Sequence, residues 1–313
     1  MAHKAFVRRP QREGLSKRWS VIGLSLFVVL DVLLVGAALD AQRGPEVVEQ
    51  IQAVPSSPPS AEPTATAAVS ANAVRPQRVL AAASGDVAWR GTIGPCPGGT
   101  AALEYTDDGG ATWKTVDPAA ETGAAAVVRV VPESESAANV VTLDAGCSPQ
   151  LVGTFVAGDA WADHSPRLGS YWYLDPKNVA AIQSPAGMVA APCSSAVMIA
   201  TRSTDEAAVL CADETVFRTT DAGSTWSAAI FVPGAVALSG APDGYIAAVA
   251  GQGECGGTSV LAITDSRPGA LAGCAGETSA PGQTVVSVSD DGTFWLWSGD
   301  VFARSTDGGL TWK

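Results

Sequence analysis

An eight-residue pattern occurs three times in this chain of 313 residues, and it constrains the fold more than any other feature of the sequence. The pattern reads Ser or Thr, any residue, Asp, any residue, Gly, any residue, Thr and Trp, and we call each copy a box. The copies are TDDGGATW at 106–113, TTDAGSTW at 219–226 and STDGGLTW at 305–312. Recurrence of one pattern along a chain indicates a fold that is assembled from similar structural units.

The residue types of a box are those that build a tight turn. Asp, Ser and Thr side chains accept hydrogen bonds from turn amides, Gly adopts positive φ without steric cost, and Trp buries a large apolar ring. We therefore expect a structural and not a catalytic role for them. The predicted structural residues are Thr106, Asp108, Gly110, Thr112, Trp113, Thr219, Asp221, Gly223, Thr225, Trp226, Ser305, Asp307, Gly309, Thr311 and Trp312.

The sequence between the boxes repeats as well. The first box Asp, Asp108, lies 29 residues after Val79, where its apolar unit starts. The same offset from Val127, the start of the second unit, reaches TFVAGDAW at 154–161, a box without its Asp. From Val236, the start of the fourth unit, the offset reaches Asp265. Units of about 50 residues, each with about four short strands, predict the blades of a β-propeller. We expect five blades, or six or seven if a degenerate blade lies within Arg167–Gln183. The apolar units begin at Val79, Val127, Val179, Val236 and Val285.

The three boxes resemble the Asp-box (BNR) repeat family, which is found in sialidases, sortilin-type receptors and photosystem II assembly factors. This resemblance covers the repeats and transfers no partner. It implies an all-β, sialidase-like propeller in which each box forms the hairpin between the two outer strands of a blade. Only one residue follows Trp312 in the sequence, so we expect the segment from Arg75 to Ala82 to close the ring beside the last blade.

The repeat alignment also predicts how the six cysteines pair. Cys193 to Cys211 and Cys255 to Cys274 have nearly equal separations in consecutive units, so each pair is expected to form a disulfide within one blade. Cys96 and Cys147 then remain, at matching positions of adjacent units, and are expected to join these units. An even number of cysteines that pair in this way indicates an oxidising compartment, and reduced buried thiols are the alternative.

The first 78 residues differ in composition from the rest of the chain. Residues 1–19 carry a net charge of +5, and residues 20–39 are an apolar stretch long enough to cross a bilayer. The positive-inside rule places 1–19 in the cytoplasm and 79–313, the propeller, outside it; a signal peptide cleaved near Ala37 to Ala41 is the alternative. Residues 40–78 are rich in Pro, Ala and Ser, which predicts a disordered linker. Asp31 lies within the apolar stretch and is either a contact to a partner helix or a protonated, tolerated acid.

Net charge and site chemistry narrow the functional classes. Residues 40–313 contain 13 basic and 29 acidic residues, a net charge of −16, which argues against nucleic acid as a partner. We predict no cofactor and no metal, although the acidic pairs 107–108 and 290–291 could contact calcium. A sialidase-like glycosidase would need a cluster of arginines and a Tyr/Glu pair at the mouth of the central tunnel. Candidates for such arginines are Arg90, Arg129, Arg202, Arg218 and Arg304.

The prediction from the sequence is a single-pass cell-membrane protein with an extracytoplasmic β-propeller that acts as a non-catalytic binding or scaffolding module. Its ligand would be a protein, a glycan or an envelope component at the propeller face. Trp172 and Tyr173, together with Asp31, are the predicted partner contacts, since aromatic residues are enriched at interfaces. A sialidase-like glycoside hydrolase is the alternative function.

Overall fold

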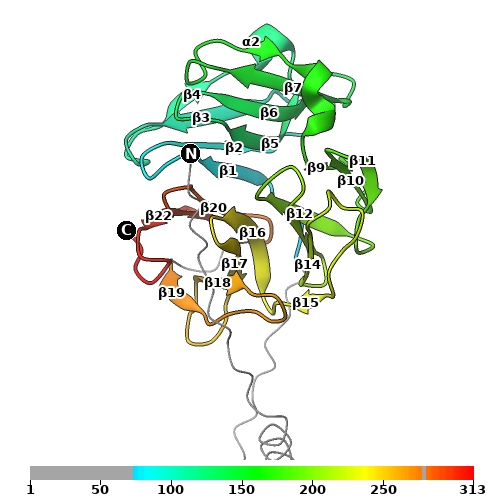
Figure 1. The fold of residues 1–313 in the computed structure, drawn as a ribbon. Helices are drawn as coiled ribbons and strands as arrows, with labels where there is room; N and C mark the ends of the chain where they lie inside the picture. The colour runs from blue at the N-terminus through cyan, green and yellow to red at the C-terminus, as the bar shows by residue number, and fades with distance from the viewer. Residues whose placement is uncertain (1–72, 277–279) are drawn as a thin grey trace, which may run out of the picture. The chain divides into compact units, whose positions relative to one another are not determined.

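Residues 73–276 and 280–313 are described by the computed structural model. Six antiparallel sheets follow one another along this part of the chain and surround a common centre (Figure 1). The inner strands of neighbouring sheets contact each other at five of the six junctions, including the one between the first and the last sheet. At the sixth junction, between the second and third sheets, the Arg129 guanidinium donates to the Trp172 carbonyl. The fold is therefore a closed β-propeller, as the repeats predict, and each sheet is one blade.

Four blades have four strands, which run from the centre outward in chain order. Blade 1 contains β1 (Arg78–Ala82), β2 (Ala88–Thr92), β3 (Ala102–Thr106) and β4 (Lys114–Val116), and the short helix α2 (Ala119–Thr122) follows it. Blade 2 contains β5 (Ala126–Pro132), β6 (Ala138–Leu143), β7 (Pro149–Thr154) and β8 (Ala162–Asp163). Blade 4 contains β12 (Ala196–Thr201), β13 (Ala207–Cys211), β14 (Thr215–Thr219) and β15 (Ile230–Phe231). Blade 5 contains β16 (Ala235–Ala241), β17 (Gly244–Ala250), β18 (Thr258–Ile263) and β19 (Ala272–Ala275).

The other two blades have three strands each. Blade 3 contains β9 (Tyr173–Leu174), β10 (Ala181–Ser184) and β11 (Gly187–Ala190), and the 3₁₀ helix η1 (Ser165–Ser170) precedes it. Blade 6 contains β20 (Thr284–Val288), β21 (Phe294–Ser298) and β22 (Val301–Ser305). Two backbone hydrogen bonds between Arg304 and Lys313 pair Lys313 with β22, at the position of a fourth strand of blade 6.

The ring has six blades, and the expectation of five is wrong. The repeat unit that begins at Val179 covers the two outer strands of blade 3 and the whole of blade 4, because blade 3 starts at Tyr173 and blade 4 already starts at Ala196. Blade 3 begins within the stretch Arg167–Gln183, where the sequence allowed a degenerate blade. Its strands are two to four residues long and it carries no box, so it leaves no repeat signature.

The predicted membrane and linker segments fall largely outside the described residues. This applies to residues 1–19, to 20–39 with Asp31, and to 40–72 of the linker. Among residues 73–276 and 280–313, we find no apolar helix with the length needed to traverse a bilayer.

The core consists of apolar layers between successive blades. The middle strands β6 and β13 are buried at every position, because each is covered by a neighbouring blade on both faces. This explains why they read as continuous apolar runs and not as alternating ones. Between blades 1 and 2, the fully buried Trp89 lies 4.8 Å from Tyr105 and 6.1 Å from Trp161, centroid to centroid.

The ring closes where the sequence predicts it. Gln77 donates its amide to the Gly282 carbonyl, and the Ala82 amide donates to Ser287 Oγ, so the segment 75–82 lies beside β20 of blade 6. The Arg78 guanidinium strengthens this contact with a hydrogen bond to the Gln283 carbonyl and a position 4.2 Å above the Trp297 ring. The segment provides the inner strand of blade 1 and adds no strand to blade 6.

Candidate functional site

The three boxes form one hydrogen-bonded turn each, between the third strand of a blade and the position of the fourth. In the first box, Asp108 Oδ1 accepts from the Thr112 amide at 2.9 Å and Oδ2 accepts from Thr112 Oγ1 at 2.6 Å. Thr106 Oγ1 accepts from the Gly110 amide at 3.0 Å. The same bonds recur at Asp221 and Asp307 with distances that agree within 0.1 Å.

These bonds occupy the box carboxylates. Hydrogen bonds from Thr112 lower the pKa of Asp108 to about 2, and those from Thr311 do the same for Asp307. Asp291, in the second acidic pair, accepts from the amides of Gly85 and Thr293. We find no group of three or more potential metal ligands in the described part of the chain. One acid of each pair, Asp108 and Asp291, thus holds a turn.

The degraded box of blade 2 retains half of this turn. Thr154 Oγ1 still accepts from the Gly158 amide at 3.0 Å, and Trp161 Nε1 donates to the Gly158 carbonyl at 3.1 Å, as Trp113 does to Gly110. Val156 stands at the Asp position and is 49% exposed.

Restoring the missing acid is expected to stabilise the protein. Val156→Asp places a carboxylate where it can accept from the backbone amide of Ala160, so we expect a gain of about 1 kcal/mol in the free energy of unfolding. The double variant Val156→Asp, Ala160→Thr adds the second bond and should exceed the single one. Urea denaturation of both variants measures this, with Val156→Asn as the uncharged control. A loss of stability in both would contradict the turn assignment.

The two ends of the ring are held by different devices. Because strands alternate in direction within a blade, the boxes, which follow the third strands, all lie at one end, which we call the box face. The disulfides Cys96–Cys147, Cys193–Cys211 and Cys255–Cys274 lie at the opposite end, the disulfide face. These are the pairs that the repeat alignment predicts, and none of the six cysteines, all of which lie in the described part of the chain, is free.

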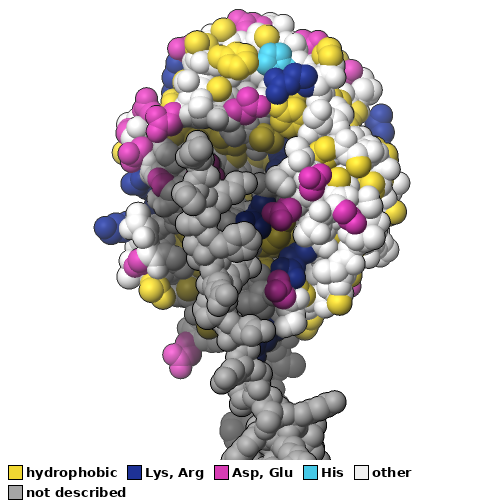
Figure 2. Space-filling model, viewed as in Figure 1, with side chains coloured by type: hydrophobic (Ala, Val, Ile, Leu, Met, Phe, Trp, Pro, Cys, Tyr) yellow, Lys and Arg dark blue, Asp and Glu magenta, His cyan; other side chains and the backbone are white. Residues whose placement is uncertain are grey.

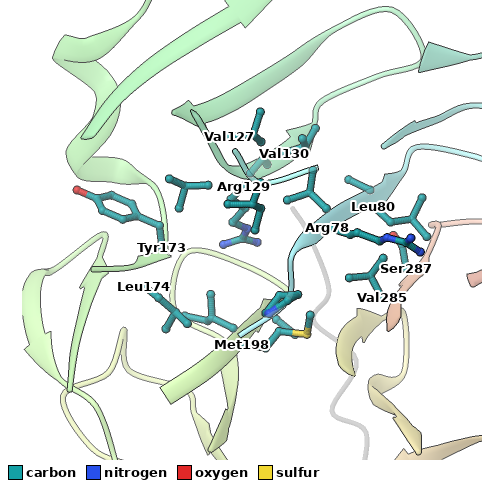
Figure 3. Close-up of a pocket in the computed structure, with 18 of the residues that line it drawn as sticks. Arg78, Leu80, Val127, Arg129, Val130, Tyr173, Leu174, Met198, Val285 and Ser287 are labelled. Carbon is teal, nitrogen blue, oxygen red and sulfur yellow. The ribbon is translucent and has the colours of Figure 1, made fainter. Parts of the chain in front are cut away.

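The predicted aromatic contacts do not form a free surface. Trp172 is 4% exposed and its Nε1 donates to the Thr204 carbonyl, so it belongs to the layer between blades 3 and 4. Tyr173 is 5% exposed and packs on Val141 and Leu151, and it is also one of the residues that line the central cavity described below (Figure 3). Both rings are therefore buried between neighbouring blades, and their role as partner contacts stays a prediction. Asp31 lies outside the described residues.

A cavity of about 570 Å³ lies at the centre of the ring, and it is the candidate functional site. All six inner strands line it, mainly with Val, Leu, Ala and Ile. Its charged lining residues are three arginines, Arg75, Arg78 and Arg129, and no Asp or Glu belongs to the described lining. The space-filling view shows Lys or Arg side chains in the hollow between the blades, next to apolar side chains and with Asp or Glu side chains beside them (Figure 2). A cationic, largely apolar cavity inside an acidic protein is a site at which an anion would be attracted.

Arg129 differs from the other candidate arginines because no carboxylate of the described residues forms an ion pair with it. Arg90, Arg202, Arg218 and Arg304 each form an ion pair, with Glu104, Glu206, Asp265 and Asp86 respectively.

The Arg129 guanidinium instead donates to the Trp172 carbonyl at 2.7 Å and to Thr201 Oγ1. It projects into the space enclosed by the inner strands (Figure 3). Burial lowers the pKa of Arg129 to about 10, which keeps it cationic at neutral pH.

The other two arginines of the lining are committed to structural contacts. Arg75 donates from Nη2 to the Asp175 carbonyl at 3.0 Å, and burial lowers its pKa while Asp175 opposes the shift. Arg78 is bound to blade 6, and Figure 3 shows its guanidinium beside Ser287. The sequence did not indicate these two as ligand-binding residues, because only ring closure brings them to the centre.

A Tyr/Glu pair of the kind that a sialidase would use is present, but it lies outside the cavity lining. Tyr171 Oη donates to Glu133 Oε1 at 2.9 Å, and Arg167 Nη2 donates to Tyr171 Oη at 3.1 Å. The Glu133 carboxylate also accepts from Asn139. Among the described residues, one arginine, Arg167, contacts the Tyr171–Glu133 pair. The hydrolase hypothesis requires several arginines around this pair, and the described residues do not provide them.

Comparison with known proteins finds fold-level similarities at low identity. No protein-family model matches the chain, and no curated protein matches it. Similar solved structures include YCF48 bound to D1 peptide, with 17% identity, 78% of this chain and 67% of that chain covered, and a TM-score of 0.29. YCF48 from Cyanidioschyzon merolae has 14% identity, 79% and 86% coverage and a TM-score of 0.29. Trypanosoma rangeli sialidase has 12% identity, 76% and 53% coverage and a TM-score of 0.38.

The chain thus spans about half the length of the sialidase that it matches. The function of this protein has to be inferred from its own residues.

Proposed function

We propose that this protein is a membrane-anchored, extracytoplasmic binding or scaffolding module whose central cavity receives an anionic group of its partner. The observation that carries the proposal is the Arg129 guanidinium, which faces the cavity without a carboxylate partner among the described residues. A buried charge without a counterion costs free energy, and perturbed ionisable groups cluster at functional sites. A bound anion would supply the missing counterion.

Binding fits the cavity better than hydrolysis does. A sialidase-like hydrolase would need a tyrosine paired with an acidic residue at the site, and the described cavity lining contains Tyr173 but no Asp or Glu. The apolar walls and three arginines, none of which forms an ion pair with a described carboxylate, instead suit a ligand that combines an apolar body with a negative charge.

Removing Arg129 is expected to abolish anion binding. Benzoate combines an apolar ring with a carboxylate, so it should raise the melting temperature of the full-length protein in detergent by binding the folded state. We expect Arg129→Met to bind benzoate at least about tenfold more weakly, because a charge-assisted hydrogen bond is lost.

Arg167→Met is the matched control, since Arg167 is an exposed arginine outside the cavity lining. Circular dichroism would verify that both variants fold. Equal benzoate shifts in the parent and in Arg129→Met would refute the anion site.

The second candidate function is a sialidase-like hydrolase, and the Tyr171–Glu133 hydrogen bond is the observation that favours it. Hydrolysis of a fluorogenic sialoside that is lost in Tyr171→Phe would establish this function in place of binding. We rank it second because the pair lies outside the cavity that holds the unpaired cation.

The membrane anchor is the remaining part of the proposal. The composition of residues 1–39 supports it, and the three disulfides support an oxidising compartment for the propeller. Protease treatment of intact cells tests whether the propeller lies outside the cytoplasm. Recovery of the full-length chain in the membrane fraction separates an anchor at residues 20–39 from a cleaved signal peptide.

A further inference from the structure

The first described residues form a strap, Ala73–Gln77, that begins at blade 4. The Ala73 amide donates to the Ala212 carbonyl, just after β13, at 3.1 Å. The Ala73 side chain is 3% exposed and belongs to the apolar cluster of Leu210, Val216 and Val232. The start of the strap is therefore anchored to blade 4 by a buried side chain as well as by its backbone.

The other end of the strap is anchored to blades 6 and 1. The Gln77 amide donates to the Gly282 carbonyl at 2.8 Å, and the Gln77 carbonyl accepts from the Ile93 amide at 2.8 Å. Gln283 Nε2 also donates to Gln77 Oε1 at 3.0 Å. In a ring of six blades, blade 4 is opposite blade 1, so the strap crosses the diameter of the ring.

The middle of the strap lies in the mouth of the cavity. Arg75 and Pro76 line the cavity, and Arg75 reaches blade 3 through its bond to the Asp175 carbonyl. On the other side, a Cβ on Gly282 would lie 3.0 Å from the Arg75 carbonyl oxygen, so blade 6 fits closely against the strap. Cys96 of the disulfide face lines the same end of the cavity.

The cavity extends from the strap to the box face. Its lining includes the residues at the box-face ends of five inner strands, which are Ala82, Pro132, Thr201, Gly240 and Val288. Arg129 lies between these ends and the strap, within β5.

We infer that the central channel is a blind pocket that is entered from the box face, with the strap as its floor. A pocket of this shape receives the anionic end of a ligand and cannot hold a chain threaded through the ring. The ligand class rests on the proposed function, whereas the direction of access rests on the strap alone.

The test measures access to a single cysteine in the pocket of the full-length protein. Leu80→Cys places the thiol on β1, where Leu80 lines the cavity and is partly exposed. The probe is a negatively charged methanethiosulfonate reagent, and mass spectrometry gives its labelling rate. Val288→Trp obstructs the box end, and Arg75→Gly with Pro76→Gly removes the side chains of the strap. Ala82→Phe replaces Val288→Trp if that variant does not fold.

We expect obstruction of the box end to slow labelling at least about tenfold, and removal of the strap side chains to change it less than about threefold. The reverse pattern, or no labelling of the introduced thiol in any variant, overturns the inference. Labelling is repeated with a positively charged reagent of the same size, so that the test of access can be separated from the test of the anion site. If Arg129→Met does not alter the ratio of the two reagents' rates, the anion site fails while the direction of access stands.

Discussion

Replacing both Cys96 and Cys147 with serine is expected to lower the free energy of unfolding by about 4 kcal/mol. The disulfide closes a loop with a sequence separation of 51 residues, and the entropy that it removes from the unfolded chain grows with loop length. It joins the turn after β2 to the turn after β6, and therefore ties blade 1 to blade 2 at the disulfide face. Urea denaturation of the oxidised protein, followed by tryptophan fluorescence, measures the loss.

The two shorter disulfides provide the comparison. Cys193–Cys211 and Cys255–Cys274 have separations of 18 and 19 residues, so the same model gives about 3 kcal/mol for each double serine variant. The chain-entropy explanation requires the larger loss for the longer loop. A loss at Cys96–Cys147 that is smaller than at either short loop would reject it.

The second large effect is expected at Gly273, where blades 5 and 6 meet. A Cβ on Gly273 would lie 2.0 Å from the Gly309 carbonyl oxygen, which belongs to the box of blade 6. Gly273 also has a φ of +53°, a conformation that side chains with a Cβ rarely adopt. Gly273→Ala must push two blades apart and also strain the backbone. We therefore expect the free energy of unfolding to fall by about 3 kcal/mol or more, measured by thermal unfolding.

Gly308→Ala is the matched control for this variant. Gly308 has a φ of +75° but open space around its Cβ position, and the corresponding places of two other boxes already hold Ala157 and Ala222 at positive φ. We therefore expect Gly308→Ala to cost less than about 1 kcal/mol. Similar losses for both glycines would mean that backbone strain, and not the contact between blades, determines the effect at Gly273.

Local turn chemistry is the part of this fold that the sequence predicted best. The bonds that Asp108 and Thr106 make lie within one box, so the pattern of residue types was enough to predict the turn. The same holds for the degraded box, in which Thr154 and Gly158 keep their bond. The cysteine pairs followed from the repeat because equivalent positions of similar units lie at equivalent places in the ring.

The sequence did not predict features that depend on how the blades come together. Blade 3 was missed as a separate unit because its short strands are stabilised by neighbouring blades and not by a repeat of their own. Trp172 was expected at the surface, yet blade 4 covers it. The alternation of a strand does not reveal whether an adjacent sheet will bury both of its faces.

The sequence by itself determined that the chain is built from repeated β-units with Asp-containing turns and three specific disulfides, because these depend on residues close in the chain or at equivalent repeat positions. The tertiary structure alone decided the number of blades, the strap across the ring and the position of Arg129 in the central cavity. Each of these arises when strands that are far apart in sequence converge on one axis. Among the described residues, Arg129 remains without a carboxylate because the acids that pair with the other candidate arginines lie elsewhere in that arrangement.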